Sequence, residues 1–241
     1  MKNPIPSPPD SRVVPVVRFV DGKSLPGEAH LIEEAVLTVR VNGAVRFKAA
    51  RTPGDEAAQA AGLCVGAGIP IRPEDINVCA DGNTVEVTIS DEDARTPRML
   101  SPVTGPGKIS VTDVIEAGKA LHEAQVLRRK TQSTHAALLF GEKFSLLSTA
   151  EDVSRHSAID KALGKAFLSG TLESARAVML TCRQNSDVMI KIVHARVPVL
   201  ISVSRPTVSA LDTAKAYGLS VILLGRGDEV VAFCGEERLL P

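Results

Sequence analysis

Residues 151–164, EDVSRHSAIDKALG, bring acidic, basic and imidazole side chains together over about three helical turns. The polar groups gather at the start of this segment, where the free N–H groups of a helix can bind an anion. The segment also supplies an apolar face, formed by Val153, Ile159, Ala162, Leu163 and Ala166. The pattern predicts a helix that starts at a ligand site. The alternative is a solvated helix surface, which charged runs commonly form.

Two further segments place an arginine and hydroxyl groups between an apolar run and a helical pattern. They are residues 181–186, TCRQNS, and 202–207, SVSRPT. A helix end supplies N–H donors and a positive dipole, and arginine supplies a planar fork of donors, so each turn suits a phosphate. The alternative is that Ser186 and Ser204 only cap helices and that the arginines are surface charges. Both turns, taken with Arg155 and Lys161, favour a phosphate-rich ligand.

The elements that position these residues follow from the apolar periodicity of the second half of the chain. A capping box at Ser110–Asp113 predicts a helix that runs to about residue 128. Apolar runs at 177–180, 197–203, 219–224 and 230–234 alternate with helical patterns at 186–195 and 206–217, with Pro206 in a first turn. Residues 109–241 are therefore expected to form an α/β domain with a parallel or mixed sheet covered on both faces. Ligands of such sheets bind beyond the carboxyl ends of the strands.

The first half of the chain predicts a smaller α+β domain over residues 13–108. Alternating apolar residues indicate strands at 37–41 and 44–48, joined by a tight turn at Asn42-Gly43. A helix is expected over 56–66 and a further strand over 85–89. Residues 96–108 hold three prolines and two glycines and indicate a connecting loop.

Composition limits the class of protein. The chain has 241 residues, of which 44% are hydrophobic and 23% charged, as is typical of a globular protein. Only 3% are aromatic and there is no Trp, so base stacking on aromatic side chains is not expected. A formal net charge of +0 argues against a general nucleic-acid binder. No apolar run of about 18 residues occurs, so no membrane-spanning helix is expected.

Several other kinds of site find no support in the sequence. The five histidines show no i, i+4 pair, and neither the H-x-E…P-C-x-x-C zinc signature nor a G-x-S-x-G motif occurs. We therefore expect no protein-bound metal. The four cysteines, Cys64, Cys79, Cys182 and Cys234, form no C-x-x-C pair, which indicates reduced thiols and a cytoplasmic protein. Residues 1–12 are polar and proline-rich, lack the form of a secretory signal and are expected to be a disordered tail.

The segment 151–161 resembles the EDVGRHNAVDK signature of the FdhD/NarQ family of formate dehydrogenase accessory proteins. Other segments resemble the family in the same order along the chain. They are 34–43 (EAVLTVRVNG), 51–56 (RTPGDE), 134–137 (THAA), 183–191 (RQNSDVMIK) and 204–207 (SRPT). The resemblance covers most of the chain from about residue 30 onward.

The resemblance implies a ligand and a set of contacts. Members of the family look like handlers of the molybdenum or tungsten cofactor of formate dehydrogenases, a pterin dithiolene that carries guanine nucleotide. The implied second domain is similar to the cytidine-deaminase fold. The residues that match family motifs, and that the resemblance marks as cofactor-binding, are Thr134, His135, Arg155, His156, Asp160, Lys161, Arg183, Ser186, Lys191, Ser204, Pro206 and Thr207.

Some of these residues have an alternative role. Arg155, His156 and Arg183 are expected to contact the ligand directly. His135 also fits a satisfied buried histidine, and Asp160 fits an orienting carboxylate or a helix cap. Lys191 also fits an ion pair with Asp187 at i, i+4.

One family motif is missing. Family members that transfer sulfur carry a C-G-x-C-G-like motif before the long helix, where a thiolate can accept and pass on sulfane sulfur. Here the loop reads VTGPGK at 103–108, with Val103 and Pro106 at the cysteine positions. Sulfur transfer through that pair is therefore not carried over. The best substitute is Cys182, at a predicted strand end beside Arg183, where a thiolate would be stabilised.

The sequence thus supports three hypotheses. The first is an accessory protein that binds the guanine-dinucleotide form of the cofactor and delivers it to the catalytic subunit of a formate dehydrogenase. The second is a sulfurtransferase that acts through Cys182, with a cysteine desulfurase as a partner. The third is a nucleotide-binding protein with an unrelated substrate. The resemblance also implies a homodimer.

Overall fold

The computed structural model describes residues 10–105 and 107–241. Its centre is a six-stranded sheet in the order β13-β12-β11-β10-β8-β9. The strands are β8 (His135–Phe140), β9 (Leu146–Asp152), β10 (Ala177–Leu180), β11 (Val199–Ser202), β12 (Ser220–Leu224) and β13 (Val230–Cys234). β10, β11 and β12 run parallel, and β8, β9 and β13 each run antiparallel to a neighbour. The expected α/β class with a mixed sheet is confirmed, and the likeness to deaminases stays a prediction.

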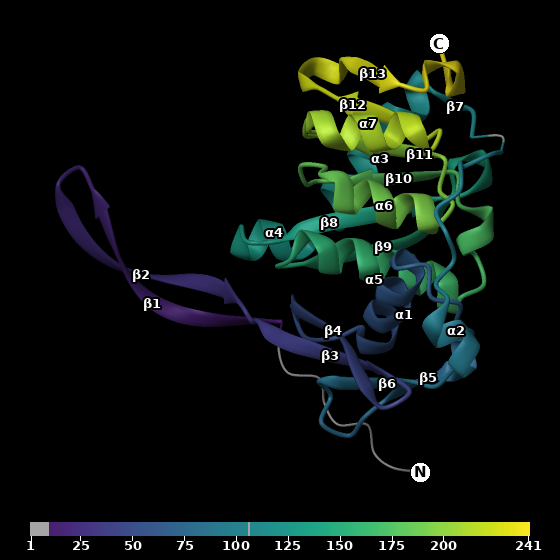
Figure 1. The fold of residues 1–241 in the computed structure, drawn as a ribbon. Helices are drawn as coiled ribbons and strands as arrows, with labels where there is room; N and C mark the ends of the chain where they lie inside the picture. Colours follow the sequence, from purple (N-terminus) through teal and green to yellow (C-terminus); the bar gives the residue numbers. More distant parts are fainter. Residues whose placement is uncertain (1–9, 106) are drawn as a thin grey trace.

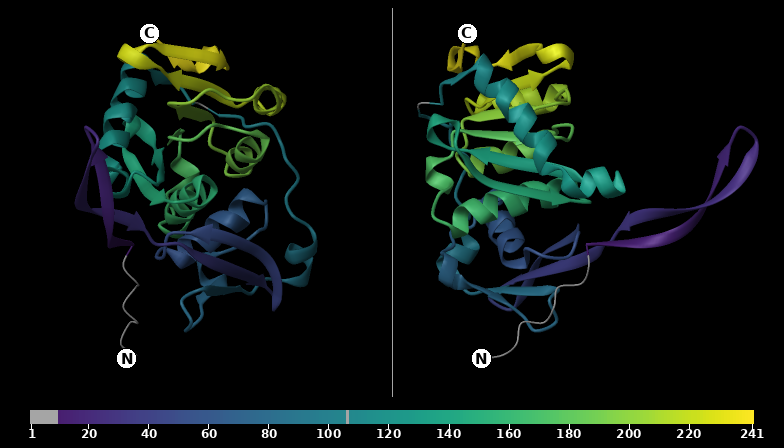
Figure 2. Two further views of the ribbon diagram at one scale, coloured as in Figure 1. Left: turned by 90° about the vertical axis from the view of Figure 1, so that its left-hand side faces the viewer. Right: turned by 180° about the vertical axis from the view of Figure 1, so that it is seen from behind.

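Helices cover both faces of this sheet (Figures 1 and 2). On one face lie α5 (Arg155–Leu168), α6 (Ser186–His194) and α7 (Val208–Ala216). On the other face α3 (Val111–Ala124) lies alone and packs Val114, Ala117 and Leu121 on buried strand residues. The core is aliphatic, as the low aromatic content requires.

The helix expected after the capping box ends earlier than predicted. Ser110 accepts the N–H of Asp113 at 3.0 Å, and the Asp113 carboxylate accepts the N–H of Ser110 at 2.8 Å, as the capping box requires. The helix stops at Ala124, and α4 (Val126–Thr131) follows it. The Glu151 carboxylate accepts the N–H groups of Leu127 and Arg128 at 2.6 and 3.0 Å. This long-range cap gives α4 its own start, which local sequence signals do not reveal.

A smaller sheet in the order β4-β3-β6-β5 precedes the large one. Its strands are β3 (Ala35–Val41), β4 (Ala44–Arg51), β5 (Ile76–Val78) and β6 (Thr84–Val87). Asn42 and Gly43 form the expected hairpin turn, with φ values of 50° and 79° that asparagine and glycine tolerate. α1 (Glu56–Gly66) packs between this sheet and α5, so it links the two parts of the fold (Figure 1). The division into domains 13–108 and 109–241 stays a prediction.

The remaining elements are short or peripheral. A long hairpin of β1 (Ser11–Val20) and β2 (Lys23–Ile32) projects from the body (Figure 1). Ser11 and Arg12, expected in the tail, belong to this hairpin, and residues 1–9 lie outside the described residues. The other elements are α2 (Asp91–Arg95), the pair β7 (Ile109–Ser110) and β14 (Leu239–Leu240), and single 3-10 turns at Pro73–Asp75, Glu142–Phe144, Leu172–Ser174, Arg226–Asp228 and Glu236–Arg238. Within the described ranges, no helix combines the length and apolarity needed to cross a membrane.

Candidate functional site

The strand directions bring most of the predicted site residues to one edge of the six-stranded sheet. β8 runs antiparallel to β10, so the start of β8, at His135, lies at the carboxyl end of β10. β9 runs antiparallel to β8 and pairs Asp152 with His135, so the start of α5 lies at the same edge. The turns after β10 and β11 complete this edge, which we call the carboxyl edge. The opposite edge, where β10, β11 and β12 begin, is the amino edge.

Hydrogen bonds connect the turns of the carboxyl edge. The Thr181 hydroxyl accepts the N–H of Ala136 at 2.9 Å and lies 3.4 Å from His135 Nδ1. Ser204 Oγ donates to the carbonyl of Thr181 at 3.4 Å. The N–H of Thr207 donates to the carbonyl of Gln184 at 3.0 Å. The edge is therefore one connected surface built from four segments of the chain.

Three arginines supply positive charge to this edge. Arg155 is the first residue of α5, and Arg183 and Arg205 lie in the turns after β10 and β11. Across residues 10–105 and 107–241, none of the three forms an ion pair with a carboxylate. No carboxylate of the described residues neutralises their charges, so these arginines are suited to bind an anion.

Two histidines beside these arginines are held in the neutral form. Burial lowers the pKa of His135, and Arg128 and Arg155 lower it further. Burial also lowers the pKa of His156, with further lowering by Lys191 and Arg155 against an opposing effect of Asp187. His156 Nε2 lies 3.4 Å from Arg155 Nε. Neutral imidazoles can donate or accept hydrogen bonds, which suits contacts to a polar ligand.

The caps of α6 and α7 are Asn185 and Thr207, and not the predicted Ser186 and Ser204. Asn185 accepts the N–H of Val188 at 3.2 Å, and Thr207 accepts the N–H of Ala210 at 3.2 Å. The interpretation of Ser186 and Ser204 as helix caps is therefore wrong. Ser186 Oγ instead lies 2.6 Å from Ser209 Oγ and links α6 to α7. Pro206 precedes the cap of α7, so its predicted place in the first turn is also wrong.

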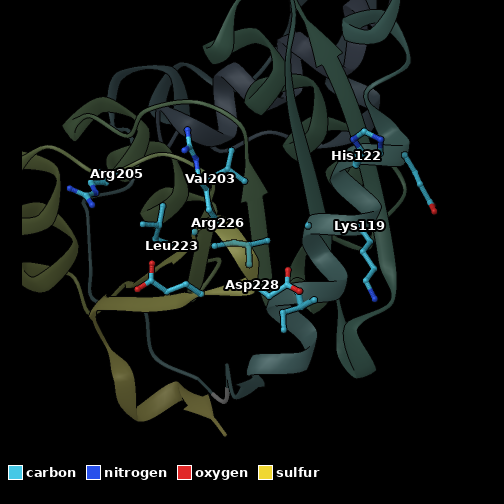
Figure 3. A pocket seen from close by; sticks show the side chains of 13 residues that line it. Lys119, His122, Val203, Arg205, Leu223, Arg226 and Asp228 are labelled. Carbon is cyan, nitrogen blue, oxygen red and sulfur yellow. The ribbon is translucent and has the colours of Figure 1, made fainter.

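A cleft of about 910 Å³ opens beside the turn after β11 (Figure 3). Val203, Leu223 and Leu224 give it apolar surface, and Lys119 and His122 of α3 also line it. Arg205 and Arg226 add positive charge, while Glu123, Asp228 and Glu229 add negative charge. The cleft lies between α3 and the turns that follow β11 and β12, and it was not predicted from the sequence. The one sequence signal that could have indicated this cleft was the i, i+3 spacing of Lys119 and His122 on the exposed side of a helix.

Four of the predicted site residues form contacts inside the protein. Lys161 is 2% exposed and pairs with Asp152, with Nζ 2.7 Å from Oδ2. Asp160 is 1% exposed and pairs with Lys191, so Lys191 does not pair with Asp187. Burial raises the pKa of Asp160, and Lys191 opposes this shift. The Asp160 carboxylate is therefore engaged in a buried ion pair, and its role as an orienting carboxylate stays a prediction. Thr134 is also buried, and its hydroxyl donates to Glu151 at 2.9 Å.

The thiols are poorly placed for reaction. Cys182 is 3% exposed, and burial raises its pKa to about 11, although Arg155 pulls it lower. The expected stabilised thiolate at Cys182 is therefore wrong. Burial also raises the pKa of Cys64 to about 12. No group of three or more histidine, cysteine or acidic side chains suited to a metal occurs in the part of the chain that the structure describes.

The loop with the altered cysteine positions lies at the amino edge. Val103 is 3% exposed, its N–H donates to the carbonyl of Tyr217 at 2.8 Å, and its carbonyl accepts from Arg238 at 3.3 Å. Gly107 packs so closely on Pro198 that a Cβ would come within 2.7 Å of that ring. Pro106 lies outside the described residues. The loop is thus anchored by its ends at the side of the sheet opposite the arginines.

Comparison with known proteins agrees with this architecture. The FdhD/NarQ family pattern matches residues 87–240. The chain is 30% identical to the sulfur carrier protein FdhD of Streptomyces avermitilis, over 93% of this chain and 94% of that protein. It is 27% identical to the protein of the same name from Methanothermobacter thermautotrophicus, over 92% and 98%.

A solved structure shares the fold. A protein crystallised as a formate dehydrogenase accessory protein of Desulfotalea psychrophila superimposes with a TM-score of 0.83 at 23% identity. The superposition covers 96% of this chain and 100% of that one. The family pattern spans more than half of the chain and includes the carboxyl edge and both strand-to-helix turns. The chain belongs to the FdhD/NarQ family.

Proposed function

We propose that this chain is a formate dehydrogenase accessory protein that binds the guanine-dinucleotide form of the molybdenum or tungsten cofactor and delivers it to the catalytic subunit. The supporting observation is the row of Arg155, Arg183 and Arg205 along one edge of the sheet beside an open cleft, with no ion pair to a carboxylate in the part of the chain that the structure describes. Family membership supports a formate dehydrogenase as the partner, and the positive charge of the edge supports an anionic cofactor as the cargo.

The dimensions of the edge suit an extended ligand. Neighbouring strands lie about 4.8 Å apart, so the path from β9 to β12 spans about 19 Å. Arginines at intervals along this path match a cargo whose pyrophosphate groups lie between ring systems. The apolar surface of Val203, Leu223 and Leu224 suits a planar ring at one end.

The predicted site residues that are buried support the position of α5 and do not contact the cargo. Asp160 and Lys161 hold α5 through internal ion pairs and do not reach the cargo. Ser204, His135 and His156 remain at the edge as hydrogen-bonding groups. The proposed cargo contacts are therefore Arg155, Arg183 and Arg205, assisted by these polar side chains.

Delivery without sulfur transfer is the version of the function that the chain supports best. Val103 occupies a position where a cysteine would be needed, and its side chain is buried. The matched relatives are named sulfur carriers, so sulfur transfer through Cys182 is the second candidate. The high pKa of Cys182 argues against it, because a protonated thiol is a poor nucleophile. The homodimer, the cysteine desulfurase and the cytoplasmic location stay predictions.

The test is to purify the protein from cells that make the cofactor and to measure released pterin and GMP by oxidation and chromatography. We expect a stoichiometric amount in the wild type, its loss in R155A/R183A, and its retention in Cys182→Ser. Absence of pterin and guanine nucleotide from the wild type, in cells whose formate dehydrogenase is filled, would overturn the proposal. Loss of function in Cys182→Ser with cargo still bound would instead favour the sulfur carrier.

A further inference from the structure

Thr52 hydrogen-bonds through its N–H, its hydroxyl and its carbonyl to the distant turn between β9 and α5 and to α5 itself. Its N–H donates to Asp152 Oδ2 at 3.1 Å, and its carbonyl accepts from Lys161 Nζ at 2.7 Å. Its hydroxyl accepts the N–H of Val153 at 3.1 Å. Thr52 follows β4 of the small sheet, whereas Asp152 and Val153 join β9 to α5 of the large one. The contact therefore joins two parts of the fold that lie about a hundred residues apart in the chain.

Asp152 extends this contact to the start of α5. Its other oxygen, Oδ1, accepts the N–H of Ser154 at 2.8 Å, and Ser154 is the N-cap of α5. Asp152 is fully buried and Thr52 is 2% exposed, so water does not compete for these bonds. Hydrogen bonds to a buried charged group are among the stronger ones in proteins. They fix residues 152–154, and Arg155 and His156 are the next two residues.

Thr52 is itself held firmly in place. The buried guanidinium of Arg51 bonds Glu56 at 2.6 Å, the carbonyl of Gly82 at 2.9 Å and Asn83 Oδ1 at 3.0 Å. Behind this segment, α1 and α5 are in close contact. A Cβ on Gly62 would lie 1.8 Å from the carbonyl oxygen of Asp160. The support for Thr52 therefore has little freedom to shift.

We propose that Thr52 is a positioning residue that sets the direction of Arg155 and His156 at the carboxyl edge. This positioning gives a role to the 51–56 segment, RTPGDE, which supplies none of the proposed cargo contacts. The consequence for cargo binding rests on the proposed function. The positioning of His156 does not depend on it, and the two statements can be tested separately.

The test compares Thr52→Val with Thr52→Ser. Valine keeps the shape and both backbone contacts of Thr52 but leaves the N–H of Val153 without its acceptor. Serine keeps the hydroxyl and loses only a methyl group, so it is the matched control. One readout is the affinity for GDP, used as a probe of the guanine-nucleotide end of the cargo. The other is the pH titration of His156 followed by NMR, assigned with His156→Gln.

We expect Thr52→Val to weaken GDP binding about tenfold, as the loss of one well-placed contact does. We also expect its His156 titration to move toward that of a solvent-exposed histidine, and Thr52→Ser to keep both wild-type values. A residue that served stability alone would lower the melting temperature without moving the His156 titration of the folded protein. A folded Thr52→Val with wild-type His156 titration would overturn the proposal.

Two further outcomes are informative. If wild-type protein does not bind GDP, the proposed function loses its support, and the His156 titration still decides the positioning role. If Thr52→Val does not fold, Thr52→Ala removes the same hydroxyl and leaves room for a water molecule, and the same two readouts apply. An unchanged His156 titration in folded Thr52→Ala would count against the proposal in the same way.

Discussion

The two edges of the six-stranded sheet differ: the carboxyl edge presents three arginines that form no ion pair with a carboxylate among the described residues, whereas Val103 and Gly107 pack on the amino edge. The first edge gathers Arg155, Arg183 and Arg205 next to a cleft. The second edge buries Val103 against the segment that precedes β12. The carboxyl edge presents arginines suited to bind an anion, whereas the amino edge is packed against a loop.

This difference shows which part of the family pattern the chain retains. The motifs at the carboxyl edge are present, and the structure brings their exposed members together. At the amino edge the cysteines are absent from the motif, and Val103, at one of the two cysteine positions, is part of the packing. The proposed cargo-binding arginines and Val103, one of the two altered cysteine positions, lie at opposite edges of one sheet, so a substitution at one edge can leave the other edge undisturbed.

Among changes that test the difference between the two edges, removal of the carboxyl-edge arginines should have the largest effect, on GDP affinity. A hydrogen bond to a charged group contributes about 1.5–3 kcal/mol, which is about tenfold or more in affinity. We expect R155A/R183A to bind GDP at least about a hundredfold more weakly, measured by calorimetry at fixed salt. Lys108→Ala, which removes an exposed charge near the amino edge, is the control and should leave GDP affinity unchanged. Equal losses in both variants would mean that only net charge matters.

The next effect concerns the ion pair beneath the carboxyl edge. Asp152 and Lys161 are buried and 2.7 Å apart. Removing one partner of such a pair costs about 3–5 kcal/mol because the other charge stays buried. We expect Asp152→Asn to lower the free energy of unfolding by this amount in urea titrations.

The amino edge supplies the control for that change. Arg176 and Glu142 lie 3.0 Å apart, but the Glu142 side chain is 73% exposed. Solvent screens such pairs, so Glu142→Gln should cost less than about 1 kcal/mol. A similar loss in both variants would contradict the view that the carboxyl edge is built on a buried electrostatic support.

A smaller effect is expected from pH. The pKa of His156 is lowered by burial and by Lys191 and Arg155, so this side chain is neutral in the free protein near pH 7. A bound phosphate favours the protonated form and raises that pKa, and by linkage a fall in pH favours binding. GDP affinity should therefore rise a few-fold as the pH falls from about 8 to about 6.

The histidine variants separate this effect from titration of the nucleotide itself. His156→Gln should flatten the pH dependence of GDP binding. Burial also lowers the pKa of His194, but His194 ends α6 away from the carboxyl edge. His194→Gln should therefore keep the wild-type dependence. A pH profile that is the same in all three proteins would exclude His156 as the titrating group.

Local signals in the sequence were sufficient for several features of the fold. The turn at Asn42-Gly43 and the capping box at Ser110–Asp113 each depend on residues a few positions apart, and both were predicted correctly. The turns after β10 and β11 were found because an apolar run followed by an arginine and hydroxyls marks a strand end. These signals placed Arg183 and Ser204 at the correct edge.

Features that depend on distant pairing were not predicted. β8 and β9 were missed, although their antiparallel pairing is what brings His135 and Arg155 to the carboxyl edge. The bonds of Thr52 to Asp152 and Val153, and the cleft beneath α3, arise only when the elements are packed. The prediction of a stabilised thiolate at Cys182 was wrong because the sequence shows the neighbouring Arg183 but does not show that Cys182 is buried.

The smallest effect is expected at the amino edge itself. Val103→Cys restores one cysteine position with a side chain of similar size, so it should cost only about 1 kcal/mol of stability. The new thiol would be buried like the valine it replaces, and burial raises a thiol pKa and slows its reactions. We expect iodoacetamide to modify it more slowly than the half-exposed Cys79, as measured by mass spectrometry of the folded protein. Modification faster than that of Cys79 would show that this position can still expose a reactive group. The argument against sulfur transfer at this loop would then depend on the identity of the residues alone and not on the packing of the loop.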